Sequence, residues 1–407
     1  MAPKIVIVGA GFAGMWAALS ASRKLSLAGK TDGSVEIILV APEPTLYIRP
    51  RLYETDLSTA SAPLTDLLAA ATVQYVQGTV QQIGVERKIL EYVSSDGITS
   101  TLAFDRLILA SGSKLFRPEV VAGIVEYSFD ADQMENALKL DAHLESLAAL
   151  PDTPARNTIV VCGGGFTGTE IAAEMPRRMR GILGQGADVK VIVLERNDNI
   201  DFMGHKSSPI VMEALISLGI EVQASQSVAS IDAEGVTTVS GTHIPSKTVI
   251  WTAGLRASAL TAQIPAERDE LGRLFVTQNL QVVGVDHVYA TGDTAHVTAD
   301  DEGHLTVMSC QHAMYLGKSV GNNAMADLLG LPQMPYSQPI YATCLALGPW
   351  GALFTLGWDR EVHLVKEEGY KMKTYINTQV IYPPPPNRAE ALAAADPRVQ
   401  AALQLIA

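Results

Sequence analysis

The feature that most constrains the fold of this chain is a motif that occurs twice. Residues 4–14 read KIVIVGAGFAG and residues 158–168 read TIVVCGGGFTG, so each copy joins a short β-branched run to G-x-G-x-x-G. A helical stretch follows each copy, and then a second apolar run at residues 35–40 and 189–194. A strand, a glycine turn, a helix and a second strand in this order form a dinucleotide-binding unit. The repeat therefore predicts an α/β fold with two Rossmann-like domains.

The glycines of the two copies have separate roles in holding a pyrophosphate. The first glycine allows the tight turn, the second lets the backbone approach the pyrophosphate, and the third lets the helix pack on the strand. The pyrophosphate then lies at the helix N-terminus, where free N–H groups and the helix dipole favour an anion. The predicted cofactor-binding glycines are Gly9, Gly11 and Gly14 in the first copy and Gly163, Gly165 and Gly168 in the second. Two nucleotide folds in one chain indicate a bound flavin, FAD, and an exchanging nicotinamide.

The residue at the tip of each second strand indicates how the adenosine ribose is held. In the second copy this residue is Glu195, whose carboxylate would bond the ribose hydroxyls and repel a 2′-phosphate. This favours NADH over NADPH, although the adjacent Arg196 leaves NADPH as an alternative. In the first copy the same place is taken by Ala41, which cannot bond a ribose. Glu43 stands two residues later, either as a ribose ligand or as a solvated loop carboxylate.

Three more segments combine a buried strand with a small-residue turn. Residues 104–112 read FDRLILASG, residues 247–254 read KTVIWTAG, and residues 288–293 read VYATGD ahead of a helix expected at about 309–329. An aspartate at the last turn is placed to accept hydrogen bonds beside the ribityl or phosphate part of a flavin. The further predicted cofactor-binding residues are Ala110, Gly112, Gly254, Gly292 and Asp293.

In these residues the chain resembles the two-dinucleotide-binding-domain flavoproteins, and within them the type II NADH dehydrogenases. The resemblance covers about residues 1–330 and also rests on LYIRPRLYE at 46–54, CGGGFTGTEIAAE at 162–174 and VIWTAGLRAS at 249–258. It implies that FAD binds the first glycine turn and the Gly-Asp turn, with Pro50 near the isoalloxazine. It also implies that NADH on the second fold passes hydride to the flavin, which then reduces a quinone.

The resemblance further implies two catalytic residues. Glu170 matches the glutamate of the family's G-G-G-x-T-G-x-E and would lie near nicotinamide and flavin. Gln311 matches the first glutamine of the family's Ala-Gln-x-x-x-Gln quinone-site motif and would also contact the cofactor. Cys310 and Tyr315 stand where that motif has its alanine and its second glutamine. These departures leave the natural electron acceptor open.

Local roles have alternatives that the residues alone do not decide. Glu170 could bond the carboxamide or relay a proton, or it could complement a helix N-terminus. Cys310 could be a redox thiol or a small buried hydrophobe. Arg49 and Arg51 could meet an anionic acceptor, with surface solvation as the favoured reading. The helix start at 309–311 could stabilise the reduced flavin through its dipole.

The motifs predict a split arrangement of domains. The FAD domain comprises residues 1–118 and 271–330, and the NAD(P)H domain is inserted at 156–254. Residues 128–150 read as one long amphipathic helix that joins the two. Residues 336–407 form a smaller α+β region, which the resemblance implies would cover the flavin and pair two subunits into a homodimer.

The composition and the cysteine pattern limit the partners and the cellular location that we expect for this chain. The net charge of −13 disfavours nucleic acid as a partner. The three cysteines form no C-x-x-C pair, which indicates a reducing, cytoplasmic location without disulfides. Histidine and cysteine spacing predicts no metal site. No apolar run reaches the roughly 18 residues of a spanning helix, while the family's C-terminal membrane helices are not evident, so peripheral membrane contact stays open.

Three functions remain compatible with the sequence. The first is an FAD-dependent NAD(P)H:acceptor oxidoreductase that uses a quinone or another small redox-active aromatic. The second is a redox sensor that binds FAD and NADH and turns over slowly, which Ala41 and Tyr315 favour. The third is a reductase of an electron-transfer protein.

Overall fold

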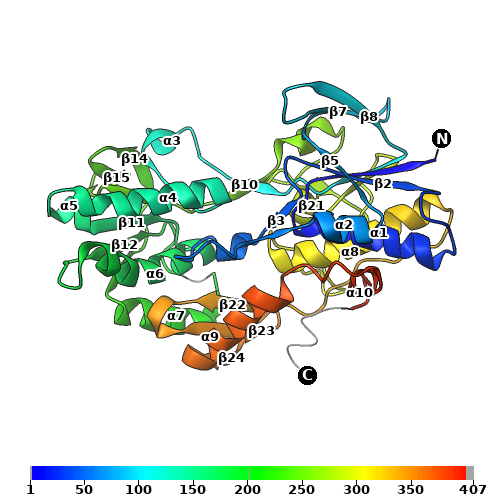
Figure 1. Ribbon diagram of the computed structural model, residues 1–407. Coiled ribbons are helices and arrows are strands. Elements are labelled where there is room, and N and C mark those ends of the chain that lie inside the picture. The colour runs from blue at the N-terminus through cyan, green and yellow to red at the C-terminus, as the bar shows by residue number, and fades with distance from the viewer. Residues whose placement is uncertain (1, 201, 400–407) are drawn as a thin grey trace.

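The computed structural model describes residues 2–200 and 202–399 and has two lobes joined at their centre (Figure 1). The first lobe is built on a five-stranded parallel sheet, ordered β20 (Val288–Ala290), β9 (Arg106–Leu109), β1 (Lys4–Val8), β2 (Glu36–Ala41) and β5 (Gln74–Gln77). The three central strands are almost wholly buried, which explains why they read as continuous apolar runs.

Two long helices of this lobe, α1 (Phe12–Leu27) and α8 (Cys310–Leu328), pack backbone to backbone. A Cβ atom on Gly317 would lie 2.4 Å from the carbonyl oxygen of Ala13, and one on Gly321 would lie 2.1 Å from that of Ala17. The small residues on both helices therefore permit an approach that larger side chains would prevent. This packing holds the N-terminus of α8 beside the N-terminal half of α1.

The second lobe repeats the design with a four-stranded parallel sheet. Its strands are ordered β13 (Ile220–Gln223), β12 (Lys190–Leu194), β11 (Thr158–Cys162) and β17 (Thr248–Trp251). Its main helices are α4 (Met134–Ser146), α6 (Phe166–Leu183) and α7 (Gly204–Ser217). The two motif copies thus lie at equivalent places in two sheets, and the predicted pair of Rossmann-like domains is confirmed.

The chain passes between the lobes along two short strands that pair with each other. Strand β10 (Ser113–Leu115) leaves the first lobe, and β18 (Leu255–Ala257) returns antiparallel to it. The prediction of one helix over residues 128–150 was wrong at its start. The backbone at Phe129 instead continues the second sheet, since its N–H donates to Val249 O and its carbonyl accepts from Trp251 N, both at 2.8 Å.

Several smaller elements complete the lobes. The first lobe adds β3 (Thr45–Tyr47), β4 (Ser61–Pro63), β6 (Thr79–Gly84), β7 (Ile89–Val93), β8 (Thr99–Ala103), β19 (Leu274–Phe275), β21 (Ala295–His296) and α2 (Thr65–Ala70). The second adds β14 (Val228–Asp232), β15 (Gly235–Thr238), β16 (His243–Pro245), α3 (Ile124–Tyr127) and α5 (Pro154–Asn157).

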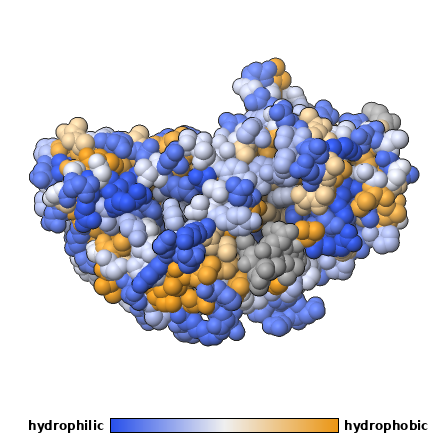
Figure 2. All heavy atoms as spheres, turned by 60° about the horizontal axis from the view of Figure 1, so that its bottom comes forward, coloured by the Kyte–Doolittle hydropathy of each residue, from blue (hydrophilic) through white to orange (hydrophobic). Residues whose placement is uncertain are grey.

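The C-terminal region is a small antiparallel sheet followed by helices. It comprises β22 (Ala342–Ala346), β23 (Ala352–Leu356), β24 (Glu361–Val365), α9 (Lys366–Tyr375), a π-helix (Ile376–Val380) and α10 (Arg388–Ala394). It lies below α6 in Figure 1 and reaches α1 through α10. Figure 2 shows hydrophobic residues gathered on the face where this region lies. Exposed large side chains on α7, β24 and α9 include Ile216, Val365 and Tyr370. Within the described ranges, no helix is both long and apolar enough to cross a membrane.

Candidate functional site

The first glycine turn leaves open space in front of helix α1. Gly9 has φ +109°, and a Cβ there would lie 2.5 Å from the carbonyl oxygen of Ala110. A Cβ on Gly14 would lie 1.8 Å from the carbonyl oxygen of Gly9. Gly11, the N-cap of α1, has no atom within 4 Å of an added Cβ. Two glycines are therefore required by packing, and the middle one faces the space that an anion at the helix N-terminus would occupy.

The second glycine turn has the same geometry. Gly163 has φ +116°, and a Cβ on Gly168 would lie 1.9 Å from the carbonyl oxygen of Gly163. Gly165 is the N-cap of α6 and again has no atom within 4 Å of an added Cβ. Because each turn keeps its open position, the residues present fit one dinucleotide pyrophosphate in each lobe.

Glu195 lies against the second turn. Its Oε2 accepts a hydrogen bond of 2.8 Å from Gly164 N, and its Oε1 accepts one of 2.9 Å from Asn197 N. The residue is 8% exposed and follows directly on β12. Backbone amides thus fix the carboxylate beside the second glycine turn.

The first turn lacks such a carboxylate. Ala41 is buried at the end of β2, and Glu43 is exposed and accepts a hydrogen bond from Tyr47 Oη. That hydrogen bond, with burial, raises the pKa of Tyr47 to about 12. Glu43 therefore has a partner within its own loop, and the two lobes differ at the ribose position.

The Gly-Asp turn after β20 belongs to a polar cluster between the lobes. Gly292 has φ +62° and packs close to α1 and α8. Asp293 Oδ2 accepts a 2.6 Å hydrogen bond from Ser113 Oγ and lies 3.7 Å from Arg49 Nη1. Arg49 also pairs with Asp132, which precedes α4. The turn that would hold the flavin is therefore linked to the segment that leads into the second lobe.

Strands β9 and β17 are each followed by a turn that contains a glycine with positive φ. Gly112 has φ +67° with open space around an added Cβ, and Gly254 has φ +80°. Among the described residues, Ser111 Oγ is buried without a hydrogen-bond partner. A free buried hydroxyl next to the first turn fits a polar ligand group bound there.

Strand β22 is hydrogen-bonded to both lobes. At one end, Ala342 N donates to Gln311 Oε1 at 3.3 Å, and Gln311 lies in the first turn of α8. At the other end, Ala346 N donates to Glu170 Oε1 at 2.9 Å, and Glu170 lies on α6. The two predicted catalytic residues thus hold opposite ends of one strand.

Glu170 forms a buried ion pair that the sequence did not indicate. Its Oε1 lies 2.8 Å from Lys373 Nζ on α9, and Lys373 also donates to Cys344 O at 3.0 Å. Burial raises the pKa of Glu170, and Lys373 opposes that rise. Burial lowers the pKa of Lys373, but Glu170 outweighs it, so that pKa lies above its ordinary value. The pKa values of both groups are therefore shifted upward, that of Glu170 by burial and that of Lys373 by the charge of Glu170.

The contacts decide several local expectations, two of which were wrong. Glu170 is the fifth residue of α6, beyond the first turn, so the reading that it complements the helix N-terminus was wrong. Surface solvation was wrong for Arg51, which is 7% exposed and pairs with Glu54. Cys310 is half-buried, and burial raises the pKa of its thiol to about 11, which favours the small hydrophobe over a redox thiol. Ser309 caps α8 by accepting a 3.3 Å hydrogen bond from His312 N, so the predicted helix start at this place is confirmed.

Lys373 was missed because it stands outside every motif. It lies in the run KEEGYKMKTY with two other lysines, and only the fold shows that it alone is buried. Its ammonium also lies 5.5 Å from the centre of the Tyr53 ring, in the loop after Pro50. The Glu170–Lys373 pair, with Tyr53 beside it, therefore lies at a junction of both lobes and the C-terminal region.

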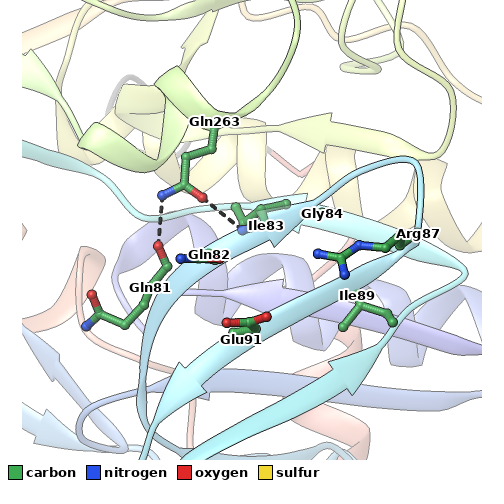
Figure 3. A pocket seen from close by; sticks show the side chains of 8 residues that line it. All are labelled: Gln81, Gln82, Ile83, Gly84, Arg87, Ile89, Glu91 and Gln263. Carbon is green, nitrogen blue, oxygen red and sulfur yellow. Dashed lines mark hydrogen bonds between the residues drawn. The ribbon is translucent and has the colours of Figure 1, made fainter.

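A separate pocket of about 330 Å³ lies between β6, β7 and the 3-10 turn Ala259–Gln263 (Figure 3). Gln263 accepts a hydrogen bond from Ile83 N and donates one to Gln81 O, both at 2.8 Å. These bonds engage backbone groups of β6, the edge strand of its sheet, where the register shifts between Val80 and Gln82. The pocket lies beside this edge and shares no residue with either glycine turn.

Comparisons with known proteins agree with this geometry. The family model for pyridine nucleotide-disulphide oxidoreductases matches residues 3–317. An NADH dehydrogenase-like protein of Mycobacterium tuberculosis is 41% identical over 98% of this chain and 99% of its own length. A demethylphylloquinone reductase of Synechocystis is 31% identical over 87% of this chain and 86% of its own. Among solved structures, NDH2 of Plasmodium falciparum in complex with NADH has the same fold, with a TM-score of 0.79 at 15% identity over 97% of this chain and 98% of that one.

Proposed function

The chain belongs to the pyridine nucleotide-disulphide oxidoreductase family, and from this premise we propose that it is an FAD-dependent NADH dehydrogenase with a quinone as electron acceptor. The observation that carries the proposal is the duplicated glycine turn, in which Gly11 and Gly165 each leave open space at a helix N-terminus. The Synechocystis relative is a demethylphylloquinone reductase, which supports a quinone acceptor.

Each lobe has a defined task in this proposal. The first glycine turn, with Gly112 and Asp293, holds FAD, with Pro50 beside the ring system. The second turn holds NADH, and Glu195 bonds the adenosine ribose and repels a 2′-phosphate. Bound FAD supplies the two-electron chemistry, since it accepts a hydride from nicotinamide and gives electrons to the quinone.

The residues at the junction orient the reactants and hold protons. A quinone that gains two electrons also takes up two protons, so the site needs a titratable group. Glu170 and Lys373 form such a group, 2.8 Å apart and buried where the lobes meet the C-terminal region. We assign proton delivery to this pair. To strand β22, bonded to Gln311 at one end and to Glu170 at the other, we assign the exclusion of water from the site.

Steady-state oxidation of NADH with menadione tests the proposal. Turnover on the order of 1 s⁻¹ or faster supports an enzyme. If NADH bleaches the flavin but turnover with quinones is far slower, the redox-sensor alternative is correct. Turnover only with a partner such as a ferredoxin would indicate a reductase of an electron-transfer protein. The cytoplasmic location and the homodimer stay predictions, which cell fractionation and light scattering would test.

A further inference from the structure

Arg51 occupies a buried position on the loop that carries Pro50. Its side chain is 9% exposed, and all three guanidinium nitrogens are used. Nε and Nη2 donate to the Glu54 carboxylate at 3.0 and 2.7 Å. Nη1 donates to Thr59 O at 2.8 Å and to Tyr382 Oη at 2.7 Å. A guanidinium supplies this fork of donors, and an ammonium does not.

The partners of Arg51 connect the loop to the C-terminal helices. Tyr382 follows the π-helix and also donates to Thr59 O. Asn377, in the π-helix, donates through Nδ2 to Glu54 Oε1 at 3.3 Å. Two side chains from the C-terminal region therefore attach to the loop, and Arg51 bonds both Glu54 and Tyr382.

The same helix face carries the buried lysine. Lys373 and Asn377 are four residues apart, so they project from one side of the helix. Lys373 reaches Glu170 on α6, and Asn377 reaches Glu54 on the loop. A π-helix is rare and often lies at a functional site. In this chain the π-helix begins directly after α9 and lies between Lys373 and Tyr382, the tyrosine that Arg51 bonds.

We propose that Arg51 is a positioning residue for quinone reduction, because its bonds to Glu54 and Tyr382 fix the C-terminal helix and thereby hold Lys373 Nζ against Glu170. The inference rests on the proposed function, since it assigns to Arg51 the support of the proton-holding pair. Arg51 itself touches neither Lys373 nor Glu170 in the structure; it acts through the helix.

The electrostatic consequence follows from what surrounds the pair. Among the described residues, the titratable groups whose charges act on this pair or on the adjacent Tyr53 are Glu54 on the loop, Cys310 on α8, Glu174 on α6 and Cys344 on β22. None of these groups is a cation, so Lys373 is the charge that offsets burial of the Glu170 carboxylate. When Arg51 is removed and the helix loosens, the apparent pKa of the quinone step moves to higher pH.

Rapid-mixing kinetics of the FAD-loaded full chain test this inference. Flavin reduction by NADH and its reoxidation by menadione are measured separately between pH 5.5 and 9 for wild type, Arg51→Met, Arg51→Lys and Tyr382→Phe. For Arg51→Met we expect reoxidation to fall about 10-fold and its apparent pKa to rise by about one unit. Arg51→Lys and Tyr382→Phe should give smaller shifts in the same direction, since each keeps part of the attachment. Flavin reduction by NADH should change by less than about threefold.

The matched control is Arg388→Met. Arg388 attaches the C-terminal region at a different place, to Asp32 and Thr72, away from the junction. It should leave the pH profile of reoxidation unchanged. If the pH profile of reoxidation is unchanged in Arg51→Met, the inference is overturned even if the rate falls. If Arg51→Met does not fold, an unchanged pH profile in Tyr382→Phe overturns the inference instead. Failure of NADH to reduce the wild-type flavin would instead overturn the proposed function.

Discussion

Glu170 Oε1 on α6 lies 2.8 Å from Lys373 Nζ on α9, and the two residues are 203 positions apart in the chain. Both side chains are less than one-tenth exposed. Taking two charges out of water costs several kcal/mol, which their attraction offsets only with good geometry and further hydrogen bonds. Here Ala346 N and Cys344 O provide those bonds, so the pair also fixes strand β22 between the lobes.

Replacing Glu170 with Gln tests the role of this pair. The amide keeps the shape but removes the partner charge of Lys373, so we expect the free energy of unfolding to fall by about 3 kcal/mol. Quinone-dependent reoxidation should fall at least about 10-fold. Urea unfolding and rapid-mixing kinetics measure the two effects. As a control, Glu368→Gln removes an exposed pair with Lys371 and should cost at most about 1 kcal/mol. Equal stability of both variants would contradict a structural role for the buried pair.

The glycine turns give a test of which lobe holds which nucleotide. Gly11→Ala places a methyl group in open space at the first cradle, so the chain should fold but lose FAD. Gly165→Ala should keep FAD and weaken NADH binding at least about 10-fold, because a methyl group blocks approach to the pyrophosphate. Flavin content by absorbance and NADH titration separate the two. Loss of FAD in Gly165→Ala with retention in Gly11→Ala would reverse the assignment.

Those variants have matched counterparts at the third glycine of each turn. In Gly14→Ala and Gly168→Ala the new Cβ would lie 1.8 and 1.9 Å from a backbone carbonyl oxygen. We expect these substitutions to prevent native folding of the lobe, which circular dichroism and limited proteolysis would detect. A folded Gly14→Ala variant with normal FAD content would contradict the close packing described above.

Coenzyme preference should depend on Glu195. Glu195→Gln removes the negative charge that would repel a 2′-phosphate and keeps an acceptor for Gly164 N. We expect the ratio of kcat/KM for NADH to that for NADPH to fall by about 10-fold, which corresponds to about 1.4 kcal/mol. The reaction with each coenzyme at fixed menadione measures this ratio. An unchanged ratio would show that another residue discriminates.

His312 predicts a specific dependence of stability on pH. Burial lowers the pKa of its imidazole to about 3, with a smaller contribution from Arg273, whereas the unfolded chain has about 6.5. Between these values the unfolded state binds a proton that the folded state does not. The free energy of unfolding therefore falls as pH falls, by up to about 1.4 kcal/mol per pH unit from this residue. Relative to wild type, His312→Gln should show a flatter profile from pH 6 to 4.5 in chemical unfolding. Parallel profiles would contradict the shifted pKa.

The fold was predictable because its signals are local. A β-branched run, a glycine turn and a helix are encoded in a dozen residues, and they occur twice in the same order. The ends of β9, β17 and β20 were also found, since each strand ends in a small-residue turn. The helix predicted over residues 128–150 begins later in the structure, as α4. The spacing of apolar residues does not show that the backbone at Phe129 pairs with β17, a strand more than 100 residues further along the chain.

The junction was not predictable because its residues act through distant partners. Lys373 and Tyr382 stand in a segment without a motif, and their contacts lie on α6 and on the loop after Pro50. Arg51 was read as a solvated residue because its neighbours in sequence do not show that Thr59 and Tyr382 surround it. Glu170 was found through its motif, but its ion pair required the fold.

The most direct test of the account is an anaerobic titration of the purified, FAD-containing protein with NADH, followed by one equivalent of menadione. We predict that the flavin absorbance near 450 nm disappears with NADH and returns with menadione, since nicotinamide on one cradle reduces the flavin on the other. A protein that binds no FAD, or a flavin that stays oxidised under excess NADH and NADPH, would contradict it.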